Sequence, residues 1–379
     1  MSVSTKYDSI LVGLGAMGAA TLYQLARRGA RVLGIDRYDP PHGFGSSAGE
    51  TRITRLAIGE GAHYTPLVAR SHAIWREIER QTGDDLLTQC GGLVISSDAK
   101  TSFTHVPAFF DNTVAAARAH GIAHELLDTV ELRRRFPQFA IRDGEIGYYE
   151  PEAGFVRPEA CIAAQLKLAR GLGAQTHTGE TVLAIANGAV TTDRGTYEAD
   201  TVIVAAGAWL PELLGPELVG PFKVHRQILC WFEAPMDFNT LPVFIWELQQ
   251  SRQGLYGFPA IDGYGVKIAT ETYADTFDPN DASREVSREE IDAMVASFIR
   301  PNFPALTGRC TKAKVCLYTV TPDFQFVIDR HPAMERVIVA SPCSGHGFKH
   351  SAAIGEALAD MATGREPAFD LSAFRFDRF

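Results

Sequence analysis

Apolar and polar residues in the first part of the chain follow the order strand, helix, strand. Residues 8–12 are a short, mostly apolar run that predicts a buried strand, and residues 19–29 carry apolar side chains at helical spacing up to a terminating glycine. Residues 31–36 predict a second strand, and a βαβ unit of this kind is expected to be parallel and right-handed. Thr65 and Pro66 have the residue types of an N-cap and a first helical position, so another helix is expected to start there.

The same kind of pattern returns in two later parts of the chain. Residues 158–171 predict a helix and residues 189–199 a hairpin. Residues 201–207 are apolar after the first position, as in a central strand of a parallel sheet. Residues 336–341 predict another buried strand, and a helix of small residues is expected from about 351 to 361.

Between these two later parts, short aromatic and β-branched runs separated by turn residues predict a mostly antiparallel sheet. We therefore expect an α/β (α+β) protein of two domains. The first is a Rossmann-like dinucleotide-binding domain assembled from the discontinuous residues 1–85, 155–215 and 320–379. The second is a substrate domain, built on the mostly antiparallel sheet, of residues 86–154 and 216–319.

The turn between the first strand and the first helix has the pattern GxGxxG, with Gly13, Gly15 and Gly18. The first glycine permits a tight turn, the second lets backbone approach a pyrophosphate, and the third allows close packing of helix on strand. The helix N-terminus then offers amide donors and a favourable dipole to phosphate. Asp36 ends the second strand, where a carboxylate can accept from ribose hydroxyls. Strand, helix and acidic residue together predict a dinucleotide site; an ordinary glycine-rich turn does not explain Asp36.

This motif does not distinguish FAD from NAD. FAD is favoured because the dinucleotide-binding domain is interrupted and resumes twice, whereas an NAD dehydrogenase usually keeps that domain contiguous. A second glycine-rich strand–loop–helix, SGHGFK at residues 344–349, contains Gly345 and Gly347. Its amides could hold the flavin end of a long cofactor, and an ordinary packed turn explains the spacing equally well.

Composition narrows the class of protein. The 379 residues are 46% hydrophobic and 21% charged, as in a globular protein, and the net charge of -9 gives no general attraction to nucleic acid or anionic lipid. No apolar run reaches the ~20 residues that span a bilayer, and the first residues lack a signal-peptide pattern. Six cysteines without a CxxC pair suit reduced thiols. We therefore expect a cytoplasmic protein without a nucleic-acid or membrane partner.

Several longer motifs occur in order along the chain. They are PPHGFGSSAGETRITR at residues 40–55, EGAHYTPL at 60–67, YGFPAIDGYGVKI at 256–268, VCLYTVTPDFQFVID at 315–329, SGHGFK, and DLSAFRFDRF at the end. Together with GxGxxG they resemble, nearly end to end, the monomeric sarcosine oxidase and N-methyl-L-tryptophan oxidase family of amine-oxidising flavoenzymes.

That resemblance implies a fold like that of D-amino acid oxidase and an FAD attached through a cysteine thioether. It implies oxidation of an N-methyl or N-alkyl amino acid by hydride transfer to the flavin, and hydrolysis of the imine to an amine and an aldehyde. Reoxidation by O2 would give hydrogen peroxide. The partners implied are a small amino acid substrate and O2, and the expected state is a monomer.

The resemblance also implies roles for residues near the flavin. Cys316 matches the cysteine that carries the flavin; taken alone, it reads as one more buried thiol. Lys267 matches the lysine that promotes oxygen reduction, because a fixed cation stabilises developing superoxide. Alternation along its strand fits a solvated lysine equally well. Arg52 matches an arginine beside the flavin ring, and a structural ion pair with Glu50 is the alternative.

Other matches concern the substrate. Arg55 and Lys349 match the pair that grips the substrate carboxylate, for which arginine supplies a bidentate contact and lysine a second charge. Tyr256 and Tyr318 match tyrosines of the active-site pocket, of which Tyr318 is assigned to catalysis, although core aromatic residues have the same appearance in sequence.

Three positions depart from the family pattern: the first two, Ala48 and Glu271, bear on the substrate, and the third, Pro342, bears on the shape of the loop at SGHGFK. Ala48 and Glu271 stand where the two named oxidases have histidines near the substrate, and Pro342 replaces a family glycine. We expect room for a substrate larger than sarcosine, with a donor or cation directed at Glu271. The alternative is that Glu271 turns away to pair with an arginine.

No metal site is expected, because the only closely spaced histidines of the SGHGFKH segment, His346 and His350, are separated by a glycine in a loop. Competing functions are a flavin dehydrogenase, a primary amino acid oxidase, and a non-catalytic flavin- or NAD-binding protein. A binding protein has no need of Arg55, Lys267 and Lys349, which argues against the last alternative.

Overall fold

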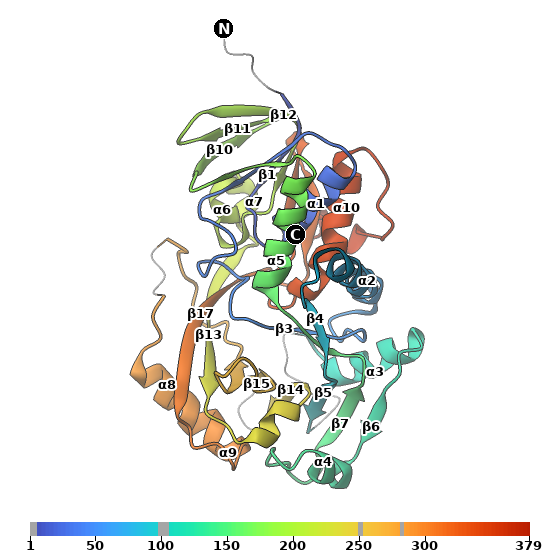
Figure 1. The fold of residues 1–379 in the computed structure, drawn as a ribbon, viewed down its shortest axis with the longest axis vertical. Helices are drawn as coiled ribbons and strands as arrows, with labels where there is room; N and C mark the ends of the chain where they lie inside the picture. Colours follow the sequence, from blue (N-terminus) through green and yellow to red (C-terminus); the bar gives the residue numbers. More distant parts are fainter. Residues whose placement is uncertain (1–5, 98–105, 249–252, 281–283) are drawn as a thin grey trace.

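Two large sheets lie one above the other along the long axis of the molecule in the computed structural model (Figure 1). The structure describes residues 6–97, 106–248, 253–280 and 284–379. Each large sheet has eight strands, and a third sheet of three strands lies at the junction between them.

The upper sheet has a parallel centre, as predicted. Strand β1 (Tyr7–Val12) lies between β2 (Val32–Asp36) and β12 (Thr196–Val204), and β12 also pairs in parallel with β19 (Met334–Ser341). These four strands come from three distant parts of the chain. Their later residues are mostly apolar and buried, as in a sheet covered on both faces, whereas β12 and β19 begin with exposed polar residues. The sheet is completed by β9 (Gln175–Thr178), β10 (Val182–Ala186), β11 (Ala189–Thr192) and β18 (Val327–His331).

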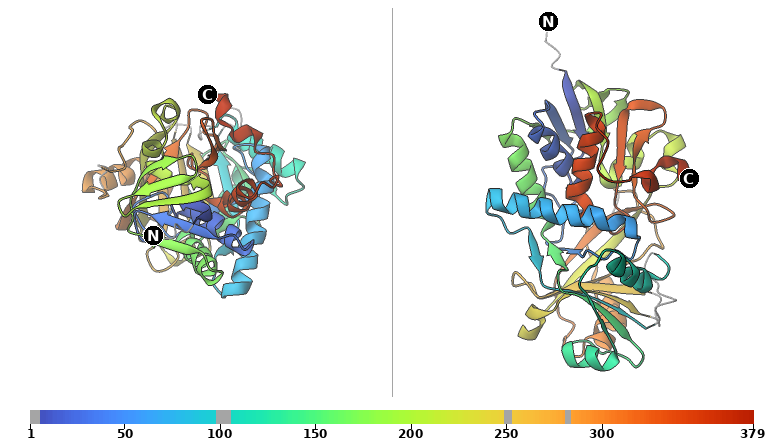
Figure 2. Two further views of the ribbon diagram at one scale, coloured as in Figure 1. Left: turned by 90° about the horizontal axis from the view of Figure 1, so that it is seen from above. Right: turned by 90° about the vertical axis from the view of Figure 1, so that its right-hand side faces the viewer.

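The helices of this half pack as their apolar stripes predict. Helix α1 (Ala16–Arg27) contacts both α5 (Pro158–Gly171) and α10 (Ser351–Ala362). Helix α2 (Thr65–Thr82) crosses the molecule between the two halves, as the right-hand view of Figure 2 shows. The α1–α10 contact is close because a Cβ on Gly355 of α10 would lie 2.4 Å from the Cβ of Ala20.

The lower sheet is mostly antiparallel, which confirms the second half of the fold prediction. Within this eight-stranded sheet, only β14 and β5 pair in parallel; the other pairs are antiparallel. Its order is β17 (Cys310–Val320), β13 (Lys223–Phe232), β16 (Val266–Thr270), β15 (Gln253–Phe258), β14 (Val243–Leu248), β5 (Gly92–Ser96), β7 (Ile146–Glu150) and β6 (Glu125–Leu127).

Short elements connect and cover the sheets. The junction sheet consists of β3 (Arg52–Thr54), β8 (Gly154–Val156) and β4 (Leu87–Gln89). The other helices are α3 (Phe109–Ala119), α4 (Thr129–Arg135), α6 (Leu210–Leu213), α7 (Pro216–Val219), α8 (Arg288–Met294), the π-helical Val295–Ile299 and α9 (Arg300–Asn302). The 3-10 turns are Ala62–Tyr64, Gly207–Trp209, Met236–Thr240, Phe348–His350, Ser372–Phe374 and Phe376–Arg378.

Element types agree with the sequence predictions, and the differences are at the ends. The strand expected at 201–207 ends at Val204, because the chain leaves the sheet there to line a cleft and Gly207 opens a 3-10 turn. The hairpin turns at residues 193–195, as expected. The domain limits given above stay a prediction. In the part of the chain that the structure describes, no helix is both long and apolar enough to cross a membrane.

Candidate active site

A long cleft runs from the carboxyl ends of the upper parallel strands to the face of the lower sheet. Its walls come from the glycine-rich turn after β1, the loop between β2 and β3, the loop after β12, the loop after β19, and strands β14 and β15. A cleft outside the carboxyl ends of parallel strands is where dinucleotides bind in open α/β sheets. The predicted residues that line it are Gly13, Gly15, Asp36, Arg52, Arg55, Tyr256, Glu271, Tyr318, Gly345, Gly347 and Lys349.

Four predicted residues lie outside this lining. Gly18, Ala48, Lys267 and Cys316 are absent from the cleft wall and lie directly behind it, in contact with residues that line it or with the segment that carries them. Their influence on a bound molecule would therefore pass through a layer of backbone or side chain, unless that layer moves.

The glycine-rich turn has the close approaches that a dinucleotide site requires. Gly13 has a φ of +89, and a Cβ on Gly18 would lie 1.8 Å from the carbonyl oxygen of Gly13. At Gly15 the nearest atom to such a Cβ is Ser47 Oγ at 3.7 Å, so this residue presents bare backbone to the cleft. No side chain caps the N-terminus of α1. The turn therefore fits a pyrophosphate, whose oxygens would accept from these amides.

Asp36 is buried at the end of β2, with both carboxylate oxygens directed at backbone. One accepts from the Leu14 amide at 2.7 Å and the other from the Tyr38 amide at 2.8 Å. These bonds tie the glycine-rich turn to the end of the strand. Since each carboxylate oxygen has a second lone pair, Asp36 keeps the capacity to accept from a ribose hydroxyl.

The loop after β19 closes the opposite wall. A Cβ on Gly347 would lie 1.6 Å from the carbonyl oxygen of Pro342, so only glycine fits there. Pro342, the departure noted in the sequence, lines the cleft at the start of this loop. A Cβ on Gly345 would lie 3.1 Å from Tyr273 Oη and 3.2 Å from the Tyr318 ring, which places this loop directly against β17 and the segment after β16.

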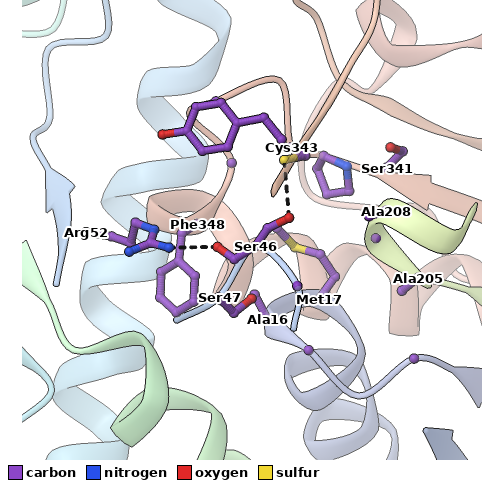
Figure 3. A pocket seen from close by; sticks show the side chains of 18 of the residues that line it. Ala16, Met17, Ser46, Ser47, Arg52, Ala205, Ala208, Ser341, Cys343 and Phe348 are labelled. Carbon is purple, nitrogen blue, oxygen red and sulfur yellow. Dashed lines mark hydrogen bonds between the residues drawn. The ribbon is translucent and has the colours of Figure 1, made fainter. Parts of the chain in front are cut away.

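Arg52 and two thiols surround Ser46 on one wall, as Figure 3 shows for Arg52 and Cys343. Arg52 Nη2 donates to the carbonyls of Ser46 at 2.8 Å and Ala48 at 2.6 Å, and lies 3.4 Å from Cys316 Sγ. Burial raises the pKa of Cys316, and Arg52 acts against it. Cys343 lines the cleft, whereas Cys316 lies behind Ser46.

Glu50, the ion-pair partner that the sequence offered for Arg52, pairs with other residues. Glu50 forms ion pairs with Lys312 and Lys314, whereas Arg52 donates to backbone carbonyls and to Cys316 Sγ. Burial lowers the pKa of Arg52, but Cys316 and the nearby tyrosines outweigh that effect and raise it overall. Arg52 thus stays a fixed cation at the cleft wall.

Lys267 is buried at 2% exposure, so the alternative of a solvated strand lysine is wrong. Its Nζ donates to the carbonyls of Gly49 and Thr51, both at 2.8 Å, and lies 3.9 Å from the Phe258 ring centroid. Burial lowers the pKa of Lys267 well below its ordinary value, and Arg52 lowers it further. Two carbonyl acceptors and an aromatic face favour the ammonium form and offset part of that effect.

Arg55 and Lys349, predicted to grip a carboxylate, lie close together with a protein carboxylate between them. Arg55 Nη2 donates to Glu60 Oε2 at 2.7 Å, and Lys349 Nζ lies 3.8 Å from Glu60 Oε1. Lys349 also donates to the carbonyl of His346 at 2.7 Å. Burial lowers the pKa of Lys349 to about 8, while Glu60 acts in the opposite direction. All three charged groups line the cleft.

Two tyrosines and an acid face this charged cluster from the lower sheet. Tyr256 and Tyr318 lie with their hydroxyl oxygens 3.1 Å apart, and burial raises the pKa of both. Glu271 lines the cleft and accepts from the hydroxyl of Tyr273 at 3.0 Å.

Ala48 is buried behind the wall, so the space expected from its small side chain does not open directly into the cleft.

Sequence reasoning missed two residues of the cleft. Glu60 stands in EGAHYTPL, a motif that was recognised without a role for its acid. A buried acid next to two cations could have been inferred only by placing Arg55 and Lys349 together. Cys343 follows Pro342 at the same departure from the family pattern. Among the described residues, no group of three or more His, Cys, Asp or Glu side chains could hold a metal ion.

Comparison with known proteins agrees with this geometry. A family model described as FAD dependent oxidoreductase (DAO) matches residues 8–361. Monomeric sarcosine oxidase of Streptomyces avermitilis is 38% identical, covering 98% of this chain and 97% of that protein. N-methyl-L-tryptophan oxidase of Salmonella newport is 35% identical, covering 99% of each. The solved structure of NikD in its open form, described as an unusual amino acid oxidase essential for nikkomycin biosynthesis, has a TM-score of 0.82 at 26% identity, and the match covers 98% of this chain and 97% of that one.

Proposed function

Given that this chain belongs to the DAO family of FAD-dependent oxidoreductases, we propose that it is an oxidase of secondary, N-methyl or N-alkyl, amino acids. The substrate C–H next to nitrogen loses a hydride, and water hydrolyses the resulting imine to an amine and an aldehyde. Oxygen takes up the two electrons together with two protons and leaves as hydrogen peroxide. FAD, when bound, supplies the hydride acceptor and relays the electrons to oxygen.

The observation that carries this proposal is the buried cation pair of Arg55 and Lys349 at the cleft wall. Burying two cations is costly unless an anion compensates them. Glu60 compensates them in this structure. A substrate carboxylate would bind the same two side chains, by a bidentate contact to Arg55 and a second charge from Lys349.

The amine end of the substrate would lie toward Tyr256, Tyr318 and Glu271, across the cleft from the cations. The tyrosine hydroxyls can each donate or accept, and Tyr318 is proposed to orient the reacting amine. Glu271 is proposed to accept from a donor or cationic group of a side chain larger than that of sarcosine. A comparison of N-methyl amino acids with apolar, polar and basic side chains, in wild type and Glu271→Gln, tests this. If both proteins prefer the same substrate side chains in the same order, the role proposed for Glu271 is contradicted.

Lys267 is proposed to supply a positive charge to oxygen reduction. Its ammonium lies behind residues 49–51, in a site from which water is excluded, where a charge acts more strongly than in water. Arg52 adds a second fixed cation on the same wall.

We propose that the cofactor is attached covalently through the thiol of Cys316. Its place in the motif VCLYTVTPD and its location next to Ser46 and Arg52, which line the cleft, support this. Acid precipitation of loaded protein should carry the flavin into the pellet, and Cys316→Ala should release it. Cys343→Ala is the matched control, because this thiol lines the cleft and should leave the flavin attached. Flavin that stays wholly in the supernatant with wild type would exclude the linkage.

The activity is tested with a substrate panel. Under nitrogen, an N-methyl amino acid should bleach the yellow protein, and air should restore the colour with release of peroxide. A protein that bleaches but recovers only with an artificial acceptor is a dehydrogenase, and one that responds only to primary amino acids is a different oxidase. A protein that never bleaches would be a binding protein.

We propose a cytoplasmic monomer that needs no other protein. The name of the monomeric sarcosine oxidase relative and the six free cysteines support this. Light scattering at two concentrations measures the state, and a mass that doubles between them contradicts it.

A further inference from the structure

Residues 49–57 contain Arg52 and Arg55, and two of their carbonyl oxygens accept hydrogen bonds from Lys267. Only three of them form a strand, β3, which pairs with β8. Both ends of the segment are irregular, and they bear the groups that matter: the carbonyls that hold Lys267 at one end and Arg55 near the other. The placement of these charges therefore depends on what fixes the two ends.

A carboxylate from the lower sheet fixes the later end. Glu150 closes β7 and is 0% exposed. Its Oε1 accepts from the Leu56 amide at 2.6 Å, and its Oε2 accepts from the Ala57 amide at 3.1 Å and from the Tyr148 hydroxyl at 2.9 Å. Arg55 itself bonds to the carbonyl of Ala57, so the two residues after Arg55 connect its side chain to Glu150.

A second carboxylate fixes the earlier end in the same manner. Glu159, in the first turn of α5, accepts from the Gly49 amide at 2.7 Å and from the Glu50 amide at 3.1 Å. Gly49 and Glu50 have φ values of +104 and +68, and the second of these is unfavourable for a residue with a side chain. Consecutive amides in such a turn form a concave anion site, which Glu159 occupies. The turn directs the carbonyls of Gly49 and Thr51 at Lys267.

We propose that Glu150 and Glu159 are positioning residues that hold the two ends of residues 49–57, Glu150 setting Arg55 and Glu159 setting the carbonyls that bind Lys267. This inference deepens the proposed function and rests on it. Both carboxylates accept mainly from backbone amides, and among the described residues neither forms an ion pair. Replacing either acid by its amide keeps the volume but turns an NH2 group toward a backbone N–H, which sets a donor against a donor.

The roles of Glu150 and Glu159 are distinguished by measuring two different properties. Affinity for a simple carboxylate inhibitor, (methylthio)acetate, reports on Arg55, and the rate at which oxygen reoxidises the reduced enzyme reports on Lys267. Glu150→Gln should weaken the inhibitor roughly 10-fold and leave reoxidation within about twofold, since misplacement of a binding group is costly. Glu159→Gln should do the reverse.

Glu79→Gln is the matched control. Glu79 also accepts from two consecutive backbone amides, those of Leu86 and Leu87, both at 2.9 Å, but these amides lie outside residues 49–57. It should change neither property. If it changes both as much as the other variants do, the effects come from general loss of structure, and the inference fails.

A second set of variants tests whether each acid acts through its assigned cation. The effect of Glu150→Gln on the inhibitor should disappear in an Arg55→Ala background, and the effect of Glu159→Gln on reoxidation in a Lys267→Met background. An effect that persists in those backgrounds overturns the assignment. Equal changes of both properties by both variants would mean that the segment responds as one unit, which also overturns it.

Failure of the proposed function has a different signature. If Arg55→Ala alone binds the inhibitor normally, the proposed carboxylate site is wrong, and so is the role proposed for Glu150. The role proposed for Glu159 is still tested by the rate of reoxidation. If an amide variant does not fold, as thermal unfolding would show, Glu150→Asp and Glu159→Asp replace it. Each keeps the charge with a shorter reach and should shift the same property in the same direction, by a smaller factor; no shift overturns the inference.

Discussion

The two ends of the cleft are built to bind by different means. At the proposed cofactor end, the turn of Gly13 to Gly18 presents backbone amides, and close approaches at Gly13 and Gly18 leave no room for a side chain at either position. At the proposed substrate end, Arg55, Glu60 and Lys349 are buried charged side chains that come from separate parts of the chain. The first end tolerates little change of shape; the second depends on the balance of charge.

The physical reason lies in what each end must desolvate. Backbone amides carry partial charges and are already oriented by the helix and strand that they terminate, so little energy is needed to hold them ready. Buried ions lose far more hydration and need partners at every stage. In the proposed substrate site, Glu60 would therefore compensate Arg55 and Lys349 until a substrate carboxylate binds, and Glu150 and Glu159 would hold the backbone behind them.

The largest effect is expected at Lys267, behind the wall between the two ends. Loss of a buried cation near developing superoxide should slow reoxidation by oxygen roughly 10²–10³-fold in Lys267→Met, with reduction by substrate much less affected. Stopped-flow measurement of the two half-reactions checks this, with the exposed Lys223→Met as control. Equal slowing of both half-reactions would make Lys267 a substrate-binding or structural residue.

Adding a side chain to the glycine-rich turn should disrupt the proposed cofactor site. In Gly18→Ala the new Cβ would lie 1.8 Å from the Gly13 carbonyl oxygen, and backbone must move. We expect a loss of about 3 kcal/mol in the free energy of unfolding, together with substoichiometric FAD. Denaturant unfolding and flavin absorbance measure the two. Gly171→Ala is the control, because a Cβ there meets nothing within 4 Å; equal losses in both variants would contradict the prediction.

Removing a positive charge should weaken binding at the proposed substrate site. Arg55→Ala should weaken (methylthio)acetate by about 1.5–3 kcal/mol, the value of a hydrogen bond to a charged group, while the corresponding neutral amide loses much less. Titration of the flavin spectrum gives both affinities. Similar losses for acid and amide would show that Arg55 shapes the pocket without recognising the carboxylate.

The smallest effect is a dependence on pH. Burial lowers the pKa of Lys349 to about 8, opposed by Glu60 and Glu271 and reinforced by Arg55. The cation is present below that pH and is lost above it, so the Kd of the inhibitor should rise, by up to about tenfold per pH unit, as the pH increases through 8. Lys349→Met should bind weakly at every pH with a flat profile. The same slope in wild type and Lys349→Met would assign the titration to another group.

Elements with short-range signals were predicted well. Residues 158–171 have their helical spacing and glycine stop within one stretch of sequence, and α5 occupies exactly that range. The strand expected at 201–207 ended early because its last residues turn toward a cleft formed by other parts of the chain. Resemblance to a family supplied the substrate end, and it could not show that Cys316 and Lys267 lie behind the wall.

The sequence by itself determined the βαβ unit, the glycine-rich turn and the parallel and antiparallel character of the two sheets, because each follows from residue types within a few positions of one another. Only the tertiary structure decided that Glu60 joins Arg55 to Lys349, and that Glu150 and Glu159 hold amides about a hundred residues away. An acid has no local signal for such a role: its partner is a backbone N–H, which every residue except proline carries, and the fold alone determines which one it meets.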